Sequence, residues 1–138
     1  MFAVADTSYV LAVALENDAD HKACIAVHRQ QEIVYLPQTT LAELAYFLTR
    51  DFGNEVTARF LVQLPLTKYR LLALEPEDVL RTANILQQYA DTRVDFVDAT
   101  IAAVAERLKI TQILTLDQRD FHIIRPKHID YFEILPSA

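Results

Sequence analysis

The chain has 138 residues, of which 52% are hydrophobic and 23% are charged, and its formal net charge is −6. This length suits one domain over residues 1–138 with a substantial core, and leaves no room for a second domain. The negative charge argues against broad electrostatic coating of nucleic acid, although nucleic acid stays open as a substrate. The single glycine, Gly53, excludes the glycine-rich phosphate loops of the Rossmann and P-loop kinds.

The sequence also predicts the compartment in which the protein works. The first residues lack the basic segment and apolar run of a signal peptide, and no segment approaches the roughly 18 apolar residues of a membrane span. The single cysteine, Cys24, rules out a disulfide within the chain and fits a reducing compartment. We therefore expect a cytoplasmic protein with no membrane partner, in which Cys24 is a small core residue.

Apolar runs and helix-start signals alternate along the chain. The predicted strands cover residues 2–5, 33–36, 69–74 and 112–116, with a short fifth strand around 131–135. The predicted helices lie between them, at about 7–15, 21–31, 40–52, 54–61, 76–86 and 95–108. Strands that alternate with helices imply a mostly parallel sheet of four to five strands that is covered on both faces. The sequence thus predicts an α/β fold with three layers.

Acidic residues recur at one edge of this predicted sheet. Asp6 and Asp117 each follow an apolar strand directly, so both lie at the carboxyl edge, where ligands bind in sheets of this kind. Glu43 and either Asp95 or Asp98 lie near the starts of helices that begin at the same edge. Carboxylates that lie so close together repel one another unless cations or protons compensate their charges, and this favours a bound metal. Oxygen ligands select Mg²⁺ or Mn²⁺ over zinc, and we interpret all four histidines as surface residues.

Each of these acids also has a structural interpretation. Thr40 and Glu43 match a capping box, in which the glutamate reaches back to the first residue of the helix. Asp95 is placed to cap the helix at 95–108, and Asp98 lies in its first turn, where the helix dipole favours a carboxylate. Capping and turn formation explain each acid separately, whereas a shared metal explains why all of them meet at one edge.

Four segments together resemble the PIN domain family. They read VADTS at 4–8, LAEL at 41–44, DFVDATIAA at 95–103 and ILTLDQRDF at 113–121. Their order and the chain length resemble the VapC-type toxins of bacterial and archaeal toxin–antitoxin pairs over nearly the whole chain. The resemblance implies a PIN-like α/β/α fold, and it places the family's metal-binding acids, which are also its catalytic acids, at Asp6, Glu43, Asp98 and Asp117.

The same resemblance implies supporting roles for other residues. Thr7 or Ser8, together with Thr115, match hydroxyl positions that orient metal ligands or water. Asp95 becomes a helix cap or an acid that supports the ligands.

Asp120 is an alternative to Asp117 as the last acid of the set. Its position before Phe121 also suits a structural turn in which Phe121 is buried. Basic residues predicted to contact substrate phosphates at the rim of the cleft are Arg93, Arg119, Arg125 and Lys127.

The resemblance implies a Mg²⁺- or Mn²⁺-dependent endoribonuclease, the toxin of a toxin–antitoxin pair, that cleaves phosphodiester bonds in RNA. It further implies a homodimer and a small antitoxin protein that covers the cleft. Two alternatives stay open. One is a PIN-type nuclease for RNA processing or DNA flap cleavage, and the other is a binding module whose acidic cleft no longer cuts.

Overall fold

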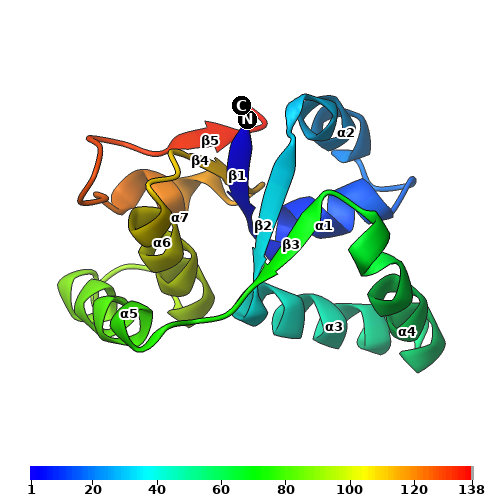
Figure 1. Ribbon diagram of the computed structural model, residues 1–138, viewed down its shortest axis with the longest axis horizontal. Coiled ribbons are helices and arrows are strands. Elements are labelled where there is room, and N and C mark those ends of the chain that lie inside the picture. The colour runs from blue at the N-terminus through cyan, green and yellow to red at the C-terminus, as the bar shows by residue number, and fades with distance from the viewer. Residues whose placement is uncertain (138) are drawn as a thin grey trace.

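The computed structural model describes residues 1–137, so Ala138, the last residue of the predicted domain, lies outside the described part. Figure 1 shows a central sheet with helices on both of its faces. The strands are β1 (Phe2–Ala5), β2 (Ile33–Pro37), β3 (Tyr69–Leu72), β4 (Gln112–Leu114) and β5 (Glu133–Leu135). The α-helices are α1 (Thr7–Ala14), α2 (His21–Gln30), α3 (Gln38–Phe52), α4 (Asn54–Gln63), α5 (Pro76–Gln88), α6 (Phe96–Leu108) and α7 (Gln118–Ile123), and Leu64–Leu66 form a 3₁₀ turn. Among these described elements, no helix is both long and apolar enough to cross a membrane.

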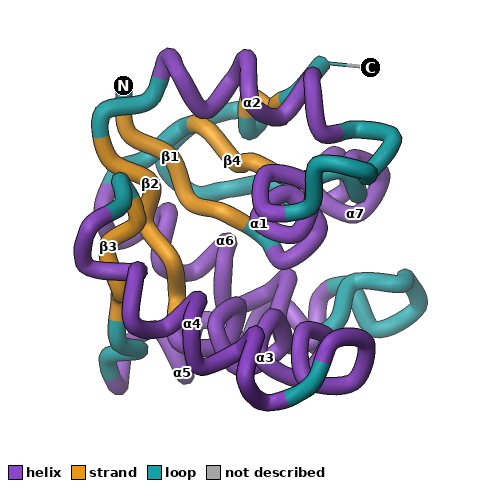
Figure 2. Tube along the Cα trace, turned by 90° about the vertical axis from the view of Figure 1, so that its right-hand side faces the viewer, coloured by secondary structure: helices purple, strands orange, loops and turns teal. Residues whose placement is uncertain are grey.

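The sheet is parallel throughout, in the order β3-β2-β1-β4-β5. β1 lies at its centre, with Ala3 opposite Val34 of β2 on one side and opposite Gln112 of β4 on the other. The chain builds outward from β1 to β3 and then crosses back to add β4 and β5, and Figure 2 shows the central strands side by side. The strand order reverses between β1 and β4, and open α/β sheets bind ligands beyond the carboxyl ends of the strands at such a point. The predicted fold class is therefore confirmed.

Both faces of the central strand are covered. Ala3 and Ala5 point into the core beneath α1 to α4, while Val4 points into the core beneath α5 to α7, and all three are fully buried. Figure 1 shows α1, α2 and α4 on one side of the sheet and α5, α6 and α7 on the other. Because a strand that is buried on both faces needs apolar side chains at every position, β1 is a continuous apolar run.

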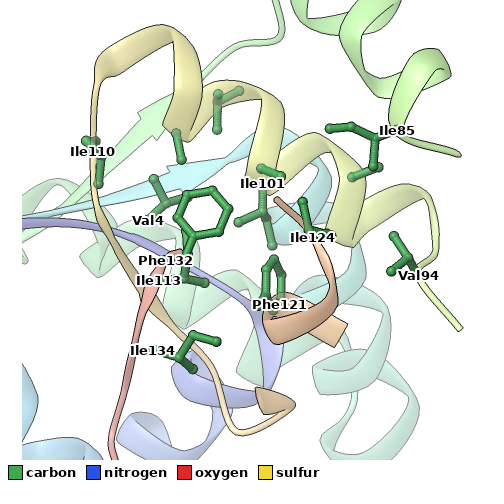
Figure 3. Packing of buried hydrophobic residues seen from close by; sticks show 14 residues of the cluster. Val4, Ile85, Val94, Ile101, Ile110, Ile113, Phe121, Ile124, Phe132 and Ile134 are labelled. Atoms are coloured by element: carbon green, nitrogen blue, oxygen red, sulfur yellow. The ribbon is translucent and has the colours of Figure 1, made fainter. Parts of the chain in front are cut away.

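The core beneath α5 to α7 holds α6 and α7 against the sheet. Every residue of α6 from Asp98 to Ala105 is buried, and α6 packs on β1 and β2. Figure 3 shows Ile101 of α6 and Phe121 of α7 in this cluster, both fully buried. The prediction that Phe121 is buried is confirmed, although it lies in the short helix α7 rather than in a turn.

The predicted capping box of the helix at 40–52 is wrong. α3 begins at Gln38, and Pro37 rather than Thr40 precedes its first turn. The Thr40 hydroxyl instead donates a hydrogen bond to the carbonyl of Ala5 at 3.1 Å. Glu43 is thus released from capping, and Thr40 ties α3 to the end of β1.

The prediction that all four histidines are surface residues is also wrong. His28 is half-buried, and its ring forms a 2.7 Å hydrogen bond with the Tyr9 hydroxyl. Burial lowers the pKa of His28 to about 4, and the nearby Lys68 contributes. His21 and His128 are half-buried as well, so only His122 is exposed. Cys24 is buried, as predicted.

Phe121→Ala is expected to lower the free energy of unfolding by about 3–5 kcal/mol, because it removes a fully buried ring and leaves a cavity beneath α6. Urea denaturation followed by circular dichroism measures this change. The neighbouring exposed residue supplies a control, since His122→Ala is expected to stay within about 0.5 kcal/mol of the parent. Equal effects of the two substitutions would contradict the packing described for α7.

Candidate functional site

Asp6 lies where β1 ends and α1 begins, at the carboxyl end of the central strand and next to β4. Its amide donates to the Leu114 carbonyl of β4 at 2.9 Å, so strand pairing fixes its backbone. Its carboxylate accepts hydrogen bonds from the Thr7 amide and from the Thr115 hydroxyl, each at 2.8 Å. The Asp6 side chain is thus held as the cap of α1 and is buried, with only 6% exposure.

Hydroxyl groups link the start of α1 to the loop after β4. The Ser8 hydroxyl lies 3.3 Å from the Thr115 hydroxyl and accepts a hydrogen bond from the Leu116 amide at 2.9 Å. Thr115 also accepts from the Asp117 amide at 2.9 Å. Within residues 1–137 the buried Thr7 hydroxyl has no hydrogen-bond partner. Of the predicted supporting hydroxyls, Thr115 and Ser8 therefore form the network, and Thr7 contributes through its amide.

Asp95 and Asp98 cap the start of α6 reciprocally. The Asp98 amide donates to Oδ1 of Asp95 at 2.9 Å, and the Asp95 amide donates to Oδ2 of Asp98 at 3.2 Å. Asp95 is exposed, whereas Asp98 is only 5% exposed. Capping is therefore common to both residues, and burial distinguishes them.

The buried Asp98 carboxylate lies among other acids. Burial raises the pKa of Asp98 to about 8, with further contributions from the negative charges of Asp95, Asp6 and Asp120, while the hydrogen bond from the Asp95 amide opposes the shift. Without a compensating cation, Asp98 therefore holds a proton at neutral pH. The charges that act on Asp98 thus come from its own cap, from the end of β1 and from α7.

Asp6 and Asp117 respond to the same surroundings. Burial raises the pKa of Asp6 to about 6, and the charges of Glu43 and Asp117 add to this against the two hydrogen bonds that Asp6 accepts. Burial and the neighbouring Asp120 raise the pKa of Asp117, while Arg93 opposes the shift. The Asp6 carboxylate is therefore influenced by acids on both sides, by Glu43 on α3 and by Asp117 at the start of α7.

Asp120 is more deeply placed than the sequence indicated. It is 3% exposed, and within the described chain its buried Oδ1 has no hydrogen-bond partner, whereas the Asp117 side chain is 40% exposed. The Arg93 guanidinium lies 3.6 Å from Asp117 Oδ1 and 3.7 Å from Asp120 Oδ1. The signal for this pair is the spacing of three residues on a helix, but the helix α7 itself was not predicted. Both acids belong to the cluster.

The predicted basic rim is only partly formed. Arg93 lies beside the acids, and Arg119 is exposed next to them in the chain. Arg125 turns back to donate to the carbonyl of His122. Lys127 binds Glu106 through its amide and lines a cavity of about 330 Å³ at the far end of α6. The predicted placement of Lys127 at the rim is therefore wrong.

A family model describing the PIN domain matches residues 3–125. The chain belongs to the PIN domain family. It is 27% identical over 134 residues to Ribonuclease VapC26 of Mycobacterium tuberculosis, in an alignment that covers 96% of this chain and 99% of that protein.

Solved structures share the fold of this PIN domain at low sequence identity. VapC20 of Mycobacterium tuberculosis, described as a Sarcin-Ricin loop cleaving toxin, aligns with a TM-score of 0.75 and 22% identity over 83% of this chain and 89% of its own. VapBC2 of Rickettsia felis, bound to a DNA fragment from its promoter, aligns with a TM-score of 0.70 and 13% identity over 97% and 98% of the two chains. These likenesses support the fold.

The donor chemistry of this PIN domain fits a hydrated hard cation. Its acidic side chains offer carboxylate oxygens, and a cation would offset the burial and repulsion at Asp98 and bind Oδ1 of Asp120, which accepts no hydrogen bond. In the part of the chain that the structure describes, no three histidine, cysteine, aspartate or glutamate side chains are arranged to enclose a metal ion. Mg²⁺ commonly keeps several waters and is held by one or two carboxylates, so an enclosed site is not required.

Asp98→Asn is expected to stabilise the metal-free PIN domain at pH 8 by roughly 1–3 kcal/mol and to give no gain at pH 4. The folded pKa of Asp98 is raised, so its contribution to stability is present at low pH and is lost as the pH rises toward about 8. Asparagine carries no charge and still accepts from the Asp95 amide. Urea denaturation in EDTA at both pH values measures the difference.

Asp95→Asn is the matched control, because Asp95 is exposed and asparagine caps helices about as well as aspartate. It is expected to change stability by less than about 0.5 kcal/mol at either pH. A gain for Asp98→Asn that is the same at pH 4 and pH 8 would argue against a charged, buried Asp98.

Proposed function

We propose that this PIN domain is a Mg²⁺- or Mn²⁺-dependent endoribonuclease and the toxin of a toxin–antitoxin pair. The observation that carries the proposal is that Asp6 after β1, Glu43 of α3, Asp98 of α6 and the acids at the start of α7 lie near enough for their charges to raise the pKa of Asp6 and of Asp98. The similarity to a protein named a ribonuclease, along nearly the full length of both chains, supports the same activity. The structurally similar VapC20 is described as a Sarcin-Ricin loop cleaving toxin.

The acids are proposed as metal ligands rather than as nucleophiles. The residues that would hold the cation are Asp6, Glu43, Asp98 and Asp117, with Asp120 beside them. A bound Mg²⁺ or Mn²⁺ would lower the pKa of water and stabilise negative charge on the phosphate and the leaving oxygen.

The remaining groups of the site orient these acids and the substrate. Thr115 holds Oδ2 of Asp6 and Thr7 holds Oδ1, which fixes the carboxylate and leaves a further lone pair on each oxygen. Arg93 is 64% exposed and lies beside the acids, so its guanidinium can contact a substrate phosphate. Arg119 is proposed for the same role from its exposed position.

Two protein partners belong to the proposal. A small antitoxin would cover the acidic cleft, as the toxin–antitoxin assignment requires. A second copy of the chain would cover apolar side chains that α4 and the following turn leave in solvent, because such residues favour an interface. These are Leu61, Val62 and Leu66, exposed by 43%, 77% and 87%.

The double substitution Val62→Asp, Leu66→Asp is expected to convert the proposed homodimer into a monomer, because it places charge where the partner copy would exclude water. Size-exclusion chromatography with light scattering at micromolar concentration measures the mass. Leu80→Asp, at an equally exposed apolar position on α5, is the control and should leave the mass unchanged. A parent protein that is strictly monomeric under these conditions would remove the homodimer from the proposal.

Asp6→Asn and Asp98→Asn are each expected to reduce Mg²⁺- or Mn²⁺-dependent cleavage of RNA by at least about 100-fold, the scale seen when one preorganised electrostatic group is lost. Glu55→Gln, an exposed acid on α4, is the control and should cleave at the parent rate. Cleavage sites are mapped by sequencing RNA from cells after brief induction, with Asp98→Asn as the inactive reference.

The same experiment separates the proposal from its alternatives. If both substituted proteins stay folded and cleave as the parent does, the site assignment is wrong. Cleavage of DNA flaps or of one precursor RNA without growth arrest would favour a processing nuclease. The absence of both cleavage and Mn²⁺ binding by calorimetry would favour a binding module.

A further inference from the structure

A groove with aromatic walls lies beside the acidic cluster, where α3 meets the start of α6. We call it the aromatic groove; it has a volume of about 460 Å³. The residues that define it for this argument are Thr39, Glu43, Tyr46, Phe47, Phe96 and Val97.

Two of the aromatic rings in this groove face solvent. Tyr46 is 63% exposed and Phe96 is 50% exposed. Neither ring is needed to fill the core, and a polar residue would fit at both positions. Tyr46 packs against the edge of Phe47, with 5.5 Å between ring centroids and planes at 63°. The groove therefore offers ring faces from two different helices, which suits a flat ligand.

The aromatic groove adjoins the acidic cluster, by which we mean Asp6, Glu43, Asp98, Asp117 and Asp120. Glu43 lines the groove, and its charge acts on the carboxylate of Asp6. Phe96 and Val97 lie between Asp95 and Asp98 in the first turn of α6. A ligand in the groove is consequently a direct neighbour of a ligand at the acids.

We propose that the aromatic groove binds an unpaired nucleobase of the RNA, the base of a nucleotide that adjoins the scissile phosphate. The inference rests on the proposed ribonuclease function and deepens it, because it makes the substrate a single strand or loop with an accessible base. Unstacked bases in RNA are commonly bound by stacking on aromatic side chains, whereas a base inside a duplex is unavailable.

The charges around the groove favour nucleic acid over an apolar protein surface. Arg50 lies on the same face of α3 and stacks on the groove's aromatic side chains, with its guanidinium 4.9 Å from the Phe47 ring centroid and 6.0 Å from that of Tyr46. The Arg50 guanidinium, which also donates to the Asp51 carboxylate, lies at one end, the aromatic rings in the middle and the proposed metal ligands at the other. This order suits a strand in which an exposed base stacks on the rings and the next phosphate reaches the proposed metal ligands. An apolar protein surface would have to desolvate the Glu43 carboxylate and the exposed ion pair that Arg50 forms with Asp51 at 2.8 Å.

The test measures RNA binding and cleavage after removal of one ring. Tyr46→Ala is expected to weaken binding of a short unstructured RNA by roughly 5- to 150-fold, the range for loss of one base–aromatic stack. Binding is measured in the Asp98→Asn background, so that the RNA stays intact, by the fluorescence of an aminopurine base placed next to the cleavage site. In the cleaving parent background, kcat/KM should fall by a similar factor for this RNA.

Matched variants separate stacking from general damage. Tyr46→Phe keeps the ring and should recover most of the loss, whereas Phe96→Ala should weaken binding as Tyr46→Ala does. Phe2→Ala is the control for Phe96→Ala. Phe2 is 48% exposed and lies at the amino end of β1, whereas the acids lie at its carboxyl end. The thermal midpoint of each variant is recorded to show that it is folded.

The outcomes distinguish the inference from the function on which it rests. If the parent cleaves RNA and Tyr46→Ala binds and cleaves equally well, the groove inference is overturned and the ribonuclease proposal stands. If Tyr46→Ala changes the mass of the assembly in solution but not its RNA binding, the groove belongs to a second copy, which also overturns the inference. If the parent neither binds nor cleaves RNA, the proposed function fails and the inference fails with it.

Discussion

Repulsion between buried carboxylates is the constraint on which the site depends. Asp6 and Asp98 are almost fully buried, and each has a raised pKa because it is desolvated and lies near other acids. Such groups stay buried only where the surrounding structure offsets their cost. Pairing of β1 with β4 fixes Asp6 through its amide, and the reciprocal cap of α6 fixes Asp98. The stability of the sheet and of α6 therefore keeps the carboxylates of Asp6 and Asp98 in positions where a cation would compensate their charges.

The strands were predicted because each contains a run of mostly apolar residues, but their ends depend on their partners. β3 stops at Leu72, although Leu74 continues the apolar pattern, because the adjacent β2 ends at Pro37, which is paired with Leu72. β4 stops at Leu114 for the same reason, since its neighbour β1 ends at Ala5. Helix α7 has six residues and shows too few turns for a periodic pattern. Pairing limits and very short helices are not encoded in local sequence.

The edge at which the acids meet could be predicted because it follows from strand direction alone. The state of each acid could not, since it depends on contacts between distant segments. Glu43 is free of the expected capping box because Thr40 is bound to the Ala5 carbonyl of β1. Asp120 is more buried than Asp117 because it lies within α7 next to the buried Phe121, whereas Asp117 precedes the helix.

The start of α6 joins the acidic cluster to the aromatic groove. The cap holds Asp95 and Asp98 against each other, and the two residues between them, Phe96 and Val97, contribute to the groove. Residues 98–105 of α6 are buried, and the helix packs on β1, which leads directly into Asp6, so the same packed elements carry both surfaces. A site built on such a rigid element holds its groups in fixed geometry. In the proposed complex, a base held in the groove would thus fix its neighbouring phosphate relative to the acids, so that positioning and chemistry depend on the same helix turn.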